Sequence, residues 1–197
     1  MVMGRTAYVW IIFFCVGVPS YAGISDWFAG FTWKVDPVKK YERHPRVRAL
    51  LDTIAFAEGT DNPEGYRTIF SYKYFDDFSD HPRQVHCVEY QGKELCSSAA
   101  GRYQFLRKTW DRVRDTLNLP DFSPKNQDRA AIYLMYEKDA LEPLLRPEYD
   151  LSEVFARINT EWASIPGAPY GQKVRDAAEL ERVFKDRLQW HEYVRRA

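Results

Sequence analysis

The sequence predicts an α+β fold that is mostly helical, with a small β-hairpin lobe flanking a cleft. Apolar residues follow a helical period over residues 45–58, and residues 60–100 then lose that period and contain short β-rich runs. Helical patterns return after residue 100. One helix, a β excursion and several further helices is the layout of an α+β domain.

The first 22 residues have the pattern of a secretory signal peptide. Arg5 precedes an uncharged, mostly apolar run over residues 6–18, and small residues stand at Ser20 and Ala22. The run is shorter than the roughly 20 apolar residues that span a bilayer. We therefore expect export to the periplasm or the medium without a stable membrane anchor. An uncleaved anchor is the alternative, and the excess of basic residues after the run favours it.

Residues 23–44 are rich in aromatic side chains and have no helical period, so we expect an N-terminal extension that lies over the domain. The domain itself is expected to span residues 45–197. Its first helix begins at Pro45, a position that tolerates proline, and ends at Gly59. Glu58 therefore lies in the last helical turn, where the negative end of the helix dipole tends to raise the pKa of a carboxyl group.

The remaining elements follow in order. Short strands are expected at residues 68–70 and 72–75, and two strand arms are expected around the turn at residues 91–92. Later helices are expected over residues 103–117, after Ser123, over residues 151–162 and over residues 174–190.

Cys87 and Cys96 stand on the two arms of the predicted hairpin and form an even pair once Cys15 leaves with the signal. A disulfide across this hairpin fits an oxidising compartment and would stabilise the fold by roughly 2.5–3 kcal/mol. Two free thiols are the alternative. No neighbouring residues complete a four-ligand metal site, so we expect no metal and no cofactor.

The charge balance restricts the class of partner. Lys and Arg number 28, and Asp and Glu also number 28, so the formal net charge is zero. A nucleic-acid binder would normally show a basic excess, so we expect no nucleic-acid partner. Aromatic residues make up 16% of the chain, which suits a packed core and also a groove that stacks on sugars.

Glu58 is the candidate for chemistry. A carboxyl group at a helix end that opens into a polar lobe suits a general acid, because the cleavage of a glycosidic bond needs a proton on a poor leaving oxygen. A glutamate before a glycine is also an ordinary solvated helix end. Local features alone leave both interpretations open.

Five blocks of residues, in order, resemble the bacteriophage lambda endolysin family. Together they cover the chain from about Ala49 to Gln172, and five blocks in one order are far more specific than one. The first resembles the family's catalytic-glutamate segment. The blocks are FAEGTDN (56–62), FSDHPR (78–83), AGRYQFL (100–106), DFSPKNQD (121–128), and WASIPG (162–167) followed by YGQ (170–172).

The resemblance implies a lysozyme-like fold and cleavage of peptidoglycan between N-acetylmuramic acid and N-acetylglucosamine. It further implies a lytic transglycosylase, in which Glu58 protonates the glycosidic oxygen and then acts as base on the muramic C6 hydroxyl. One alternative is a hydrolytic muramidase with the same acid. Another is a non-catalytic peptidoglycan-binding module. We expect a monomer whose partner is the bacterial glycan strand.

The other blocks provide candidate binding residues. Gly101 would let the backbone approach a sugar, and the amide of Gln104 would hydrogen-bond to it. Tyr103 is a binding candidate or a core residue, and Tyr170 and Gln172 would position the reacting sugar or belong to a rigid loop.

Asp80, His81 and Arg83 form a polar cluster that we expect to support the lobe rather than bind ligand. The sequence departs from the family pattern where relatives often carry adjacent glycines, because it has Ser71 and Tyr72 there. A second catalytic carboxyl group, at Asp61 or Asp80, cannot be placed from sequence alone.

Overall fold

The protein is mostly helical in the computed structural model, which describes residues 36–90, 92–171 and 174–197. The predicted signal peptide, residues 23–35 of the predicted extension and Gln172 lie outside these residues. The helices are α2 (Pro45–Glu58), the 3-10 helix η1 (Gly65–Arg67), α3 (Arg107–Leu117), α4 (Pro124–Glu137), α5 (Leu141–Leu145), α6 (Leu151–Ile158) and α7 (Ala177–Arg196). Among the described residues, no helix has the length and apolar character required to cross a membrane.

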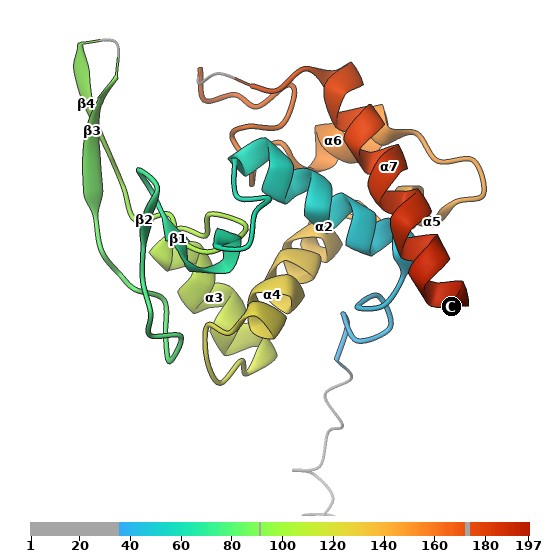
Figure 1. Cartoon of the computed structure of the whole chain (residues 1–197), viewed down its shortest axis with the longest axis horizontal. Helices are drawn as coiled ribbons and strands as arrows, with labels where there is room; N and C mark the ends of the chain where they lie inside the picture. Colours follow the sequence, from blue (N-terminus) through green and yellow to red (C-terminus); the bar gives the residue numbers. More distant parts are fainter. Residues whose placement is uncertain (1–35, 91, 172–173) are drawn as a thin grey trace, which may run out of the picture. The chain divides into compact units, whose positions relative to one another are not determined.

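The strands form two antiparallel hairpins. β1 (Thr68–Ile69) pairs with β2 (Lys73–Tyr74), and β3 (His86–Tyr90) pairs with β4 (Lys93–Ser97). Figure 1 shows α2 with its start beside α7 and its C-terminal end directed toward the hairpins. α2 therefore carries its last residue, Glu58, to the boundary between the helices and the β lobe. This arrangement confirms the predicted α+β class.

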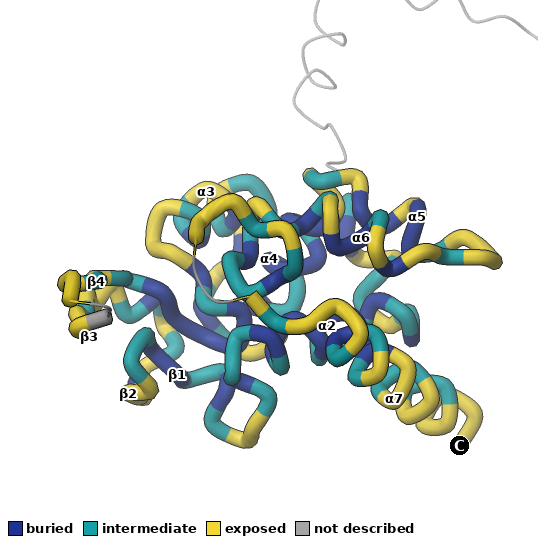
Figure 2. Tube along the Cα trace, turned by 90° about the horizontal axis from the view of Figure 1, so that it is seen from above, coloured by how far each residue is buried: buried dark blue, intermediate teal, exposed yellow. Residues whose placement is uncertain are grey.

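α2 is the central helix and has the predicted bounds. The His44 side chain accepts a hydrogen bond from the Arg46 backbone N–H at 3.3 Å, and Gly59 ends the helix in the left-handed conformation with φ 74°. Leu50, Leu51 and other side chains of α2 are fully buried, and α7 packs along the helix. Figure 2 shows the buried centre of the domain, with exposed positions along the outer face of α7 and at the tip of the β3–β4 hairpin.

Residues 36–44, the described part of the predicted extension, contact the domain. Val38 is fully buried, and the side chains of Asp36 and Glu42 form ion pairs with Arg129 of α4. The compact unit of the chain extends from residue 36 to residue 197.

Three predicted helix boundaries are wrong. Tyr103 precedes α3, because the backbone from Gly101 to Gln104 forms a turn in which the Gln104 N–H donates to the Gly101 carbonyl at 3.1 Å. α6 ends at Ile158, so Trp162 lies in the following turn. α7 begins at Ala177 because the Asp176 carboxylate caps it, accepting from the Glu179 N–H at 2.9 Å. α5 and η1 are too short to carry a detectable period.

Cys87 and Cys96 face each other across the β3–β4 hairpin and form a disulfide. β3 and β4 form a sheet of two strands. A hairpin with so few strands is marginally stable alone, so the crosslink is a local source of order.

The turn between β1 and β2 holds two residues in a strained backbone conformation. Ser71 has φ 69° and Tyr72 has φ 58°. The left-handed region costs about 1–2 kcal/mol for a residue with a Cβ, and bulky residues rarely adopt it.

A single buried amide joins three segments behind the cleft. Gln127 of α4 is fully buried, and its Oε1 accepts from the Arg102 N–H at 2.9 Å. Its Nε2 donates to the carbonyls of Tyr66 at 2.9 Å and Phe122 at 2.8 Å. All of its polar atoms are paired, as the burial of an amide requires.

Gly101 fits against this amide only because it has no side chain. It has φ 78°, and a Cβ there would stand 2.3 Å from the Gln127 Oε1. We predict that Gly101→Ala lowers the free energy of unfolding by about 3 kcal/mol, from backbone strain and from the clash.

Gly92→Ala is the matched control, since Gly92 has φ 73° and nothing within 4 Å of the added Cβ. It should cost about 1 kcal/mol in urea unfolding. Equal losses for the two variants would show that the contact with Gln127 is unimportant.

Candidate active site

Glu58 lies where two cavities meet. The larger has a volume of about 520 Å³ and the smaller about 400 Å³, and Glu58, Phe70 and Gln104 line both. Among the described residues, Glu58 is the only carboxyl group that does so. The larger cavity is also lined by Leu95, Cys96, Ser97, Thr109, Glu161, Ala163 and Tyr170, and the smaller by Thr60, Thr68, Ile69, Ser71, Tyr72 and Val88.

The Glu58 carboxyl group is half-buried and accepts a hydrogen bond from a residue far along the chain. The Ser164 hydroxyl donates to its Oε1 at 2.6 Å. Burial raises the pKa of Glu58 above the ordinary value of 4.5, and the Ser164 hydrogen bond and the Arg175 charge partly oppose this rise. The pKa of Glu58 is raised, as the sequence predicted. The largest cause is burial, whereas the sequence indicated the helix dipole.

Arg175 is fixed against the last turn of α2. Its Nε donates to the Ala57 carbonyl at 3.4 Å, and its guanidinium carbon lies 5.1 Å from the centre of the Phe56 ring. Its backbone N–H donates to the Ser164 carbonyl at 2.9 Å. The loop after α6 is thereby joined to the helix end that carries the acid.

The other acidic candidates are engaged elsewhere. Asp61 pairs with Arg102 at 3.0 Å and with Arg187, and neither Asp61 nor Asp80 lines either of these two cavities. Glu161 lines the larger cavity but forms an ion pair with Lys138 at 2.9 Å. Glu58 therefore differs from them in combining burial with a place in both cavities.

Gln104 and Tyr170 lie in the cleft. The Gln104 Nε2 donates to the carbonyl of Gly101 at 2.9 Å and to that of Thr68 at 3.3 Å, which leaves its amide oxygen available to a ligand. The Tyr170 hydroxyl donates to the Thr160 carbonyl at 2.6 Å, and the side chain is 52% exposed along the larger cavity. Both residues lie within reach of a molecule bound there.

Tyr103 and Gly101 lie mainly behind the cleft. The Tyr103 side chain is buried, and its hydroxyl donates to the Asp128 Oδ1 at 2.6 Å, although Tyr103 also contributes to the lining of the larger cavity. Gly101 is buried against Gln127 and is not among the residues that line either cavity. Packing against Asp128 and Gln127 therefore explains why a tyrosine stands at position 103 and a glycine at position 101, without a contact to a ligand.

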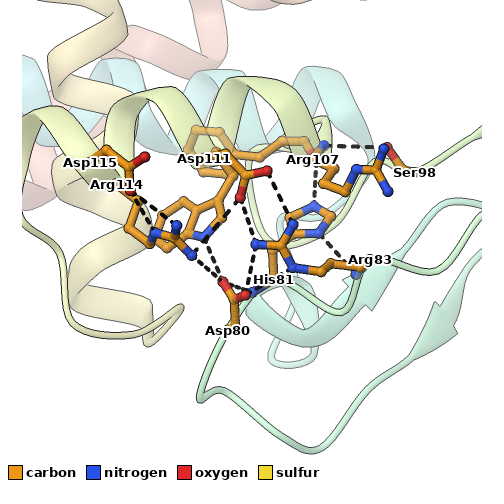
Figure 3. A network of polar contacts seen from close by, with 10 residues as sticks. Asp80, His81, Arg83, Ser98, Arg107, Asp111, Arg114 and Asp115 are labelled. Carbon is orange, nitrogen blue, oxygen red and sulfur yellow. Dashed lines mark hydrogen bonds and ion pairs between the residues drawn. The ribbon is translucent and has the colours of Figure 1, made fainter.

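Asp80, His81 and Arg83 form a network with α3, away from the cavity linings. Asp80 accepts from the Trp110 Nε1 at 3.1 Å, and Arg83 forms two hydrogen bonds to Asp111 at 3.1 and 2.6 Å. Figure 3 shows both carboxylates facing the guanidinium groups of Arg83 and Arg114. The network joins the segment before β3 to α3.

His81 is part of this network. It is buried, its Nδ1 accepts from the Arg83 N–H at 3.0 Å, and its Nε2 lies 2.9 Å from the Phe105 carbonyl, to which it donates. Burial lowers the pKa of His81 below its ordinary value of 6.5, so the neutral ring is favoured.

Sequence reasoning missed Ser164, Arg175 and Phe70 as parts of the site. Ser164 lies inside one of the five blocks, so the sequence indicated that its segment belongs to the family pattern. It did not indicate the hydrogen bond to Glu58. Arg175 follows the blocks and carries no local signal. Phe70 lies in the turn after β1, where an aromatic residue ordinarily indicates packing.

The fold and the site define a class of protein. A half-buried carboxyl group with a raised pKa, held in a cleft between helices and a β lobe, is the arrangement of a lysozyme-like glycosidase. Residues 48–189 match the family model described as Endolysin. The chain therefore belongs to the endolysin family and is a peptidoglycan-cleaving enzyme.

Two phage endolysins are similar in sequence to this chain over most of the domain. The chain is 41% identical over 145 residues to the endolysin of Escherichia phage lambda, covering 71% of this chain and 89% of that protein. It is 36% identical over 156 residues to the endolysin of Escherichia phage P2, covering 72% and 92%.

Two solved structures are similar to it. One is bacteriophage lambda lysozyme complexed with a chitohexasaccharide, with a TM-score of 0.67, 39% identity, and coverage of 73% of this chain and 94% of that one. The other is lysozyme from bacteriophage lambda, with a TM-score of 0.59, 34% identity, and coverage of 76% and 94%.

The buried carboxyl group predicts a pH-dependent stability difference. Below its ordinary pKa, Glu58 is protonated in the folded and unfolded chains alike. As the pH rises, the unfolded chain loses this proton first because the folded pKa is raised, so the wild-type protein loses stability until the folded carboxyl also ionises. Glu58→Gln removes this loss.

We therefore predict that Glu58→Gln is more stable than wild type near pH 7 and that this difference shrinks as the pH falls toward 4. Urea unfolding at both pH values measures the difference. A variant that is less stable near pH 7 would contradict the account of the buried charge.

Proposed function

We propose that this chain is an exported lytic transglycosylase that cleaves the β-1,4 bond between N-acetylmuramic acid and N-acetylglucosamine. The carrying observation is that Glu58 is the only carboxyl group, among the described residues, that lines both cavities. A glycan strand lying through the two cavities would pass this carboxyl group with a sugar on either side. The relative solved with a chitohexasaccharide supports a β-linked glycan as ligand.

Glu58 acts twice in this proposal. Its raised pKa favours the protonated carboxyl group, which donates its proton to the glycosidic oxygen as the C1–O bond breaks. The resulting carboxylate takes the proton of the muramic C6 hydroxyl, whose oxygen bonds to C1. The product is a 1,6-anhydro sugar, no water is consumed, and the glutamic acid is restored.

Among the described residues, Glu58 is the only carboxyl group in the two cavities without an ion-pair partner, which supports this route. A retaining glycosidase needs a nucleophilic carboxylate about 5–5.5 Å from the acid, and an inverting one needs a base for water. In the described part of the chain, Asp61 and Asp80 are held by arginines outside the cavity linings, and Glu161 is paired with Lys138. The substrate's own hydroxyl fills the role that a second carboxylate would have.

The other predicted site residues have different roles in the proposal. Gln104 and Tyr170 would contact the sugars, with Tyr103 and Gly101 shaping the wall behind them. Gln172 is kept as a binding candidate from sequence. Export through the N-terminal segment is consistent with the Cys87–Cys96 disulfide, since such bonds persist in oxidising compartments. We propose that the enzyme acts as a monomer.

Product analysis tests the reaction type. Mass spectrometry of purified peptidoglycan after digestion should find 1,6-anhydro-muramic ends, which are one water lighter than reducing ends. A hydrolytic muramidase with the same acid is the second candidate. Reducing muramic ends as the only product would establish that candidate and overturn the transglycosylase proposal.

A further inference from the structure

The strained turn between β1 and β2 brings an aromatic ring close to the acid. Tyr72 lines the smaller cavity together with Glu58 and Gln104. Its hydroxyl oxygen lies 3.2 Å, and its nearest ring carbon 3.7 Å, from the point where a Cβ on Gly59 would stand. The ring thus reaches from the hairpin to the end of α2, beside the residue that carries the chemistry.

Neither packing nor hydrogen bonding within the protein explains this placement. Tyr72 is 71% exposed. Its hydroxyl has no hydrogen-bond partner among the described residues. The backbone at φ 58° disfavours a bulky side chain, and a glycine would fit the turn without strain.

The surrounding contacts hold the turn in place. The Phe70 N–H donates to the Ala99 carbonyl at 2.9 Å, and the Phe75 N–H donates to the Arg67 carbonyl at 3.0 Å, on the two sides of the turn. The Lys73 Nζ lies 3.3 Å from the His86 Nδ1, which joins β2 to the second hairpin. Strain that is fixed in this way beside an active site commonly serves the site.

We propose that Tyr72 is a sugar-binding residue that sets the affinity for the glycan unit in the smaller cavity. This inference rests on the proposed function of Glu58. The flat ring presents an apolar face to the C–H groups of a pyranose, and its free hydroxyl is available to the sugar's own hydroxyl groups. The amide oxygen of Gln104, on the same cavity, supplies a polar contact.

Three variants of the full chain test this. Tyr72→Gly removes the ring and relieves the strain, Tyr72→Asn removes the ring but keeps a residue that tolerates the turn, and Tyr72→Phe keeps the ring. Asn118→Gly is the control for relieved strain away from the cleft, since Asn118 has φ 51° after α3.

Two measurements apply to each variant: the initial rate of cleavage of dilute peptidoglycan, and the Kd for chitohexaose in a Glu58→Gln background. We expect Tyr72→Gly and Tyr72→Asn to cleave about tenfold more slowly and to bind about tenfold more weakly. Tyr72→Phe should stay within about threefold of wild type, because it keeps the stacking face. Tyr72→Gly should also melt about 2–4 °C higher, and Asn118→Gly should leave cleavage and binding unchanged.

Wild-type cleavage and binding by Tyr72→Gly and Tyr72→Asn would overturn the proposal. Equal losses in Tyr72→Phe would overturn the stacking role as well. These results are distinct from a failure of the proposed function, because that failure would appear as full cleavage by Glu58→Gln with Tyr72 intact.

Discussion

The burial of one carboxyl group at the end of α2 is the constraint on which the site depends. An ionised carboxylate is costly to remove from water, so the Glu58 pKa rises and the protonated form is favoured. The Ser164 hydroxyl and the Arg175 charge limit this rise. Ser164 and Arg175 both follow α6 and precede α7. This segment therefore fixes the position of the Glu58 carboxyl group and also limits the rise of its pKa.

A second buried polar group organises the wall behind the cleft. Gln127 binds the backbone at Arg102, Tyr66 and Phe122, so α4 fixes the segments before β1 and before α3 with one side chain. The turn that holds Gln104 at both cavities follows from this contact. The buried carboxyl group and the strained turn at Tyr72 reduce stability where the enzyme meets its substrate, and the fully paired amide of Gln127 contributes stability behind it.

The sequence predicted those elements whose ends are marked by proline, glycine or a turn. It failed where contacts between distant segments set the backbone conformation. Proline and glycine predicted both ends of α2, and a turn between two short strand arms predicted the disulfide hairpin. Tyr103 fitted a helical stripe, yet its backbone turns because Gly101 must approach Gln127. The hydrogen bond between Ser164 and Glu58 spans 106 residues of sequence, so no periodicity or spacing could reveal it. The resemblance to the family included both Glu58 and Ser164 but did not indicate that they contact each other.

The central claim is that Glu58 supplies the proton for cleavage. Its most direct test compares wild type, Glu58→Gln and Glu161→Gln in the rate of clearing of purified cell walls, since Glu161 is the other carboxyl group, among the described residues, that lines the larger cavity. The account predicts that Glu58→Gln clears walls about 10³-fold more slowly, while Glu161→Gln loses less than about tenfold. Clearing at the wild-type rate by Glu58→Gln would contradict it.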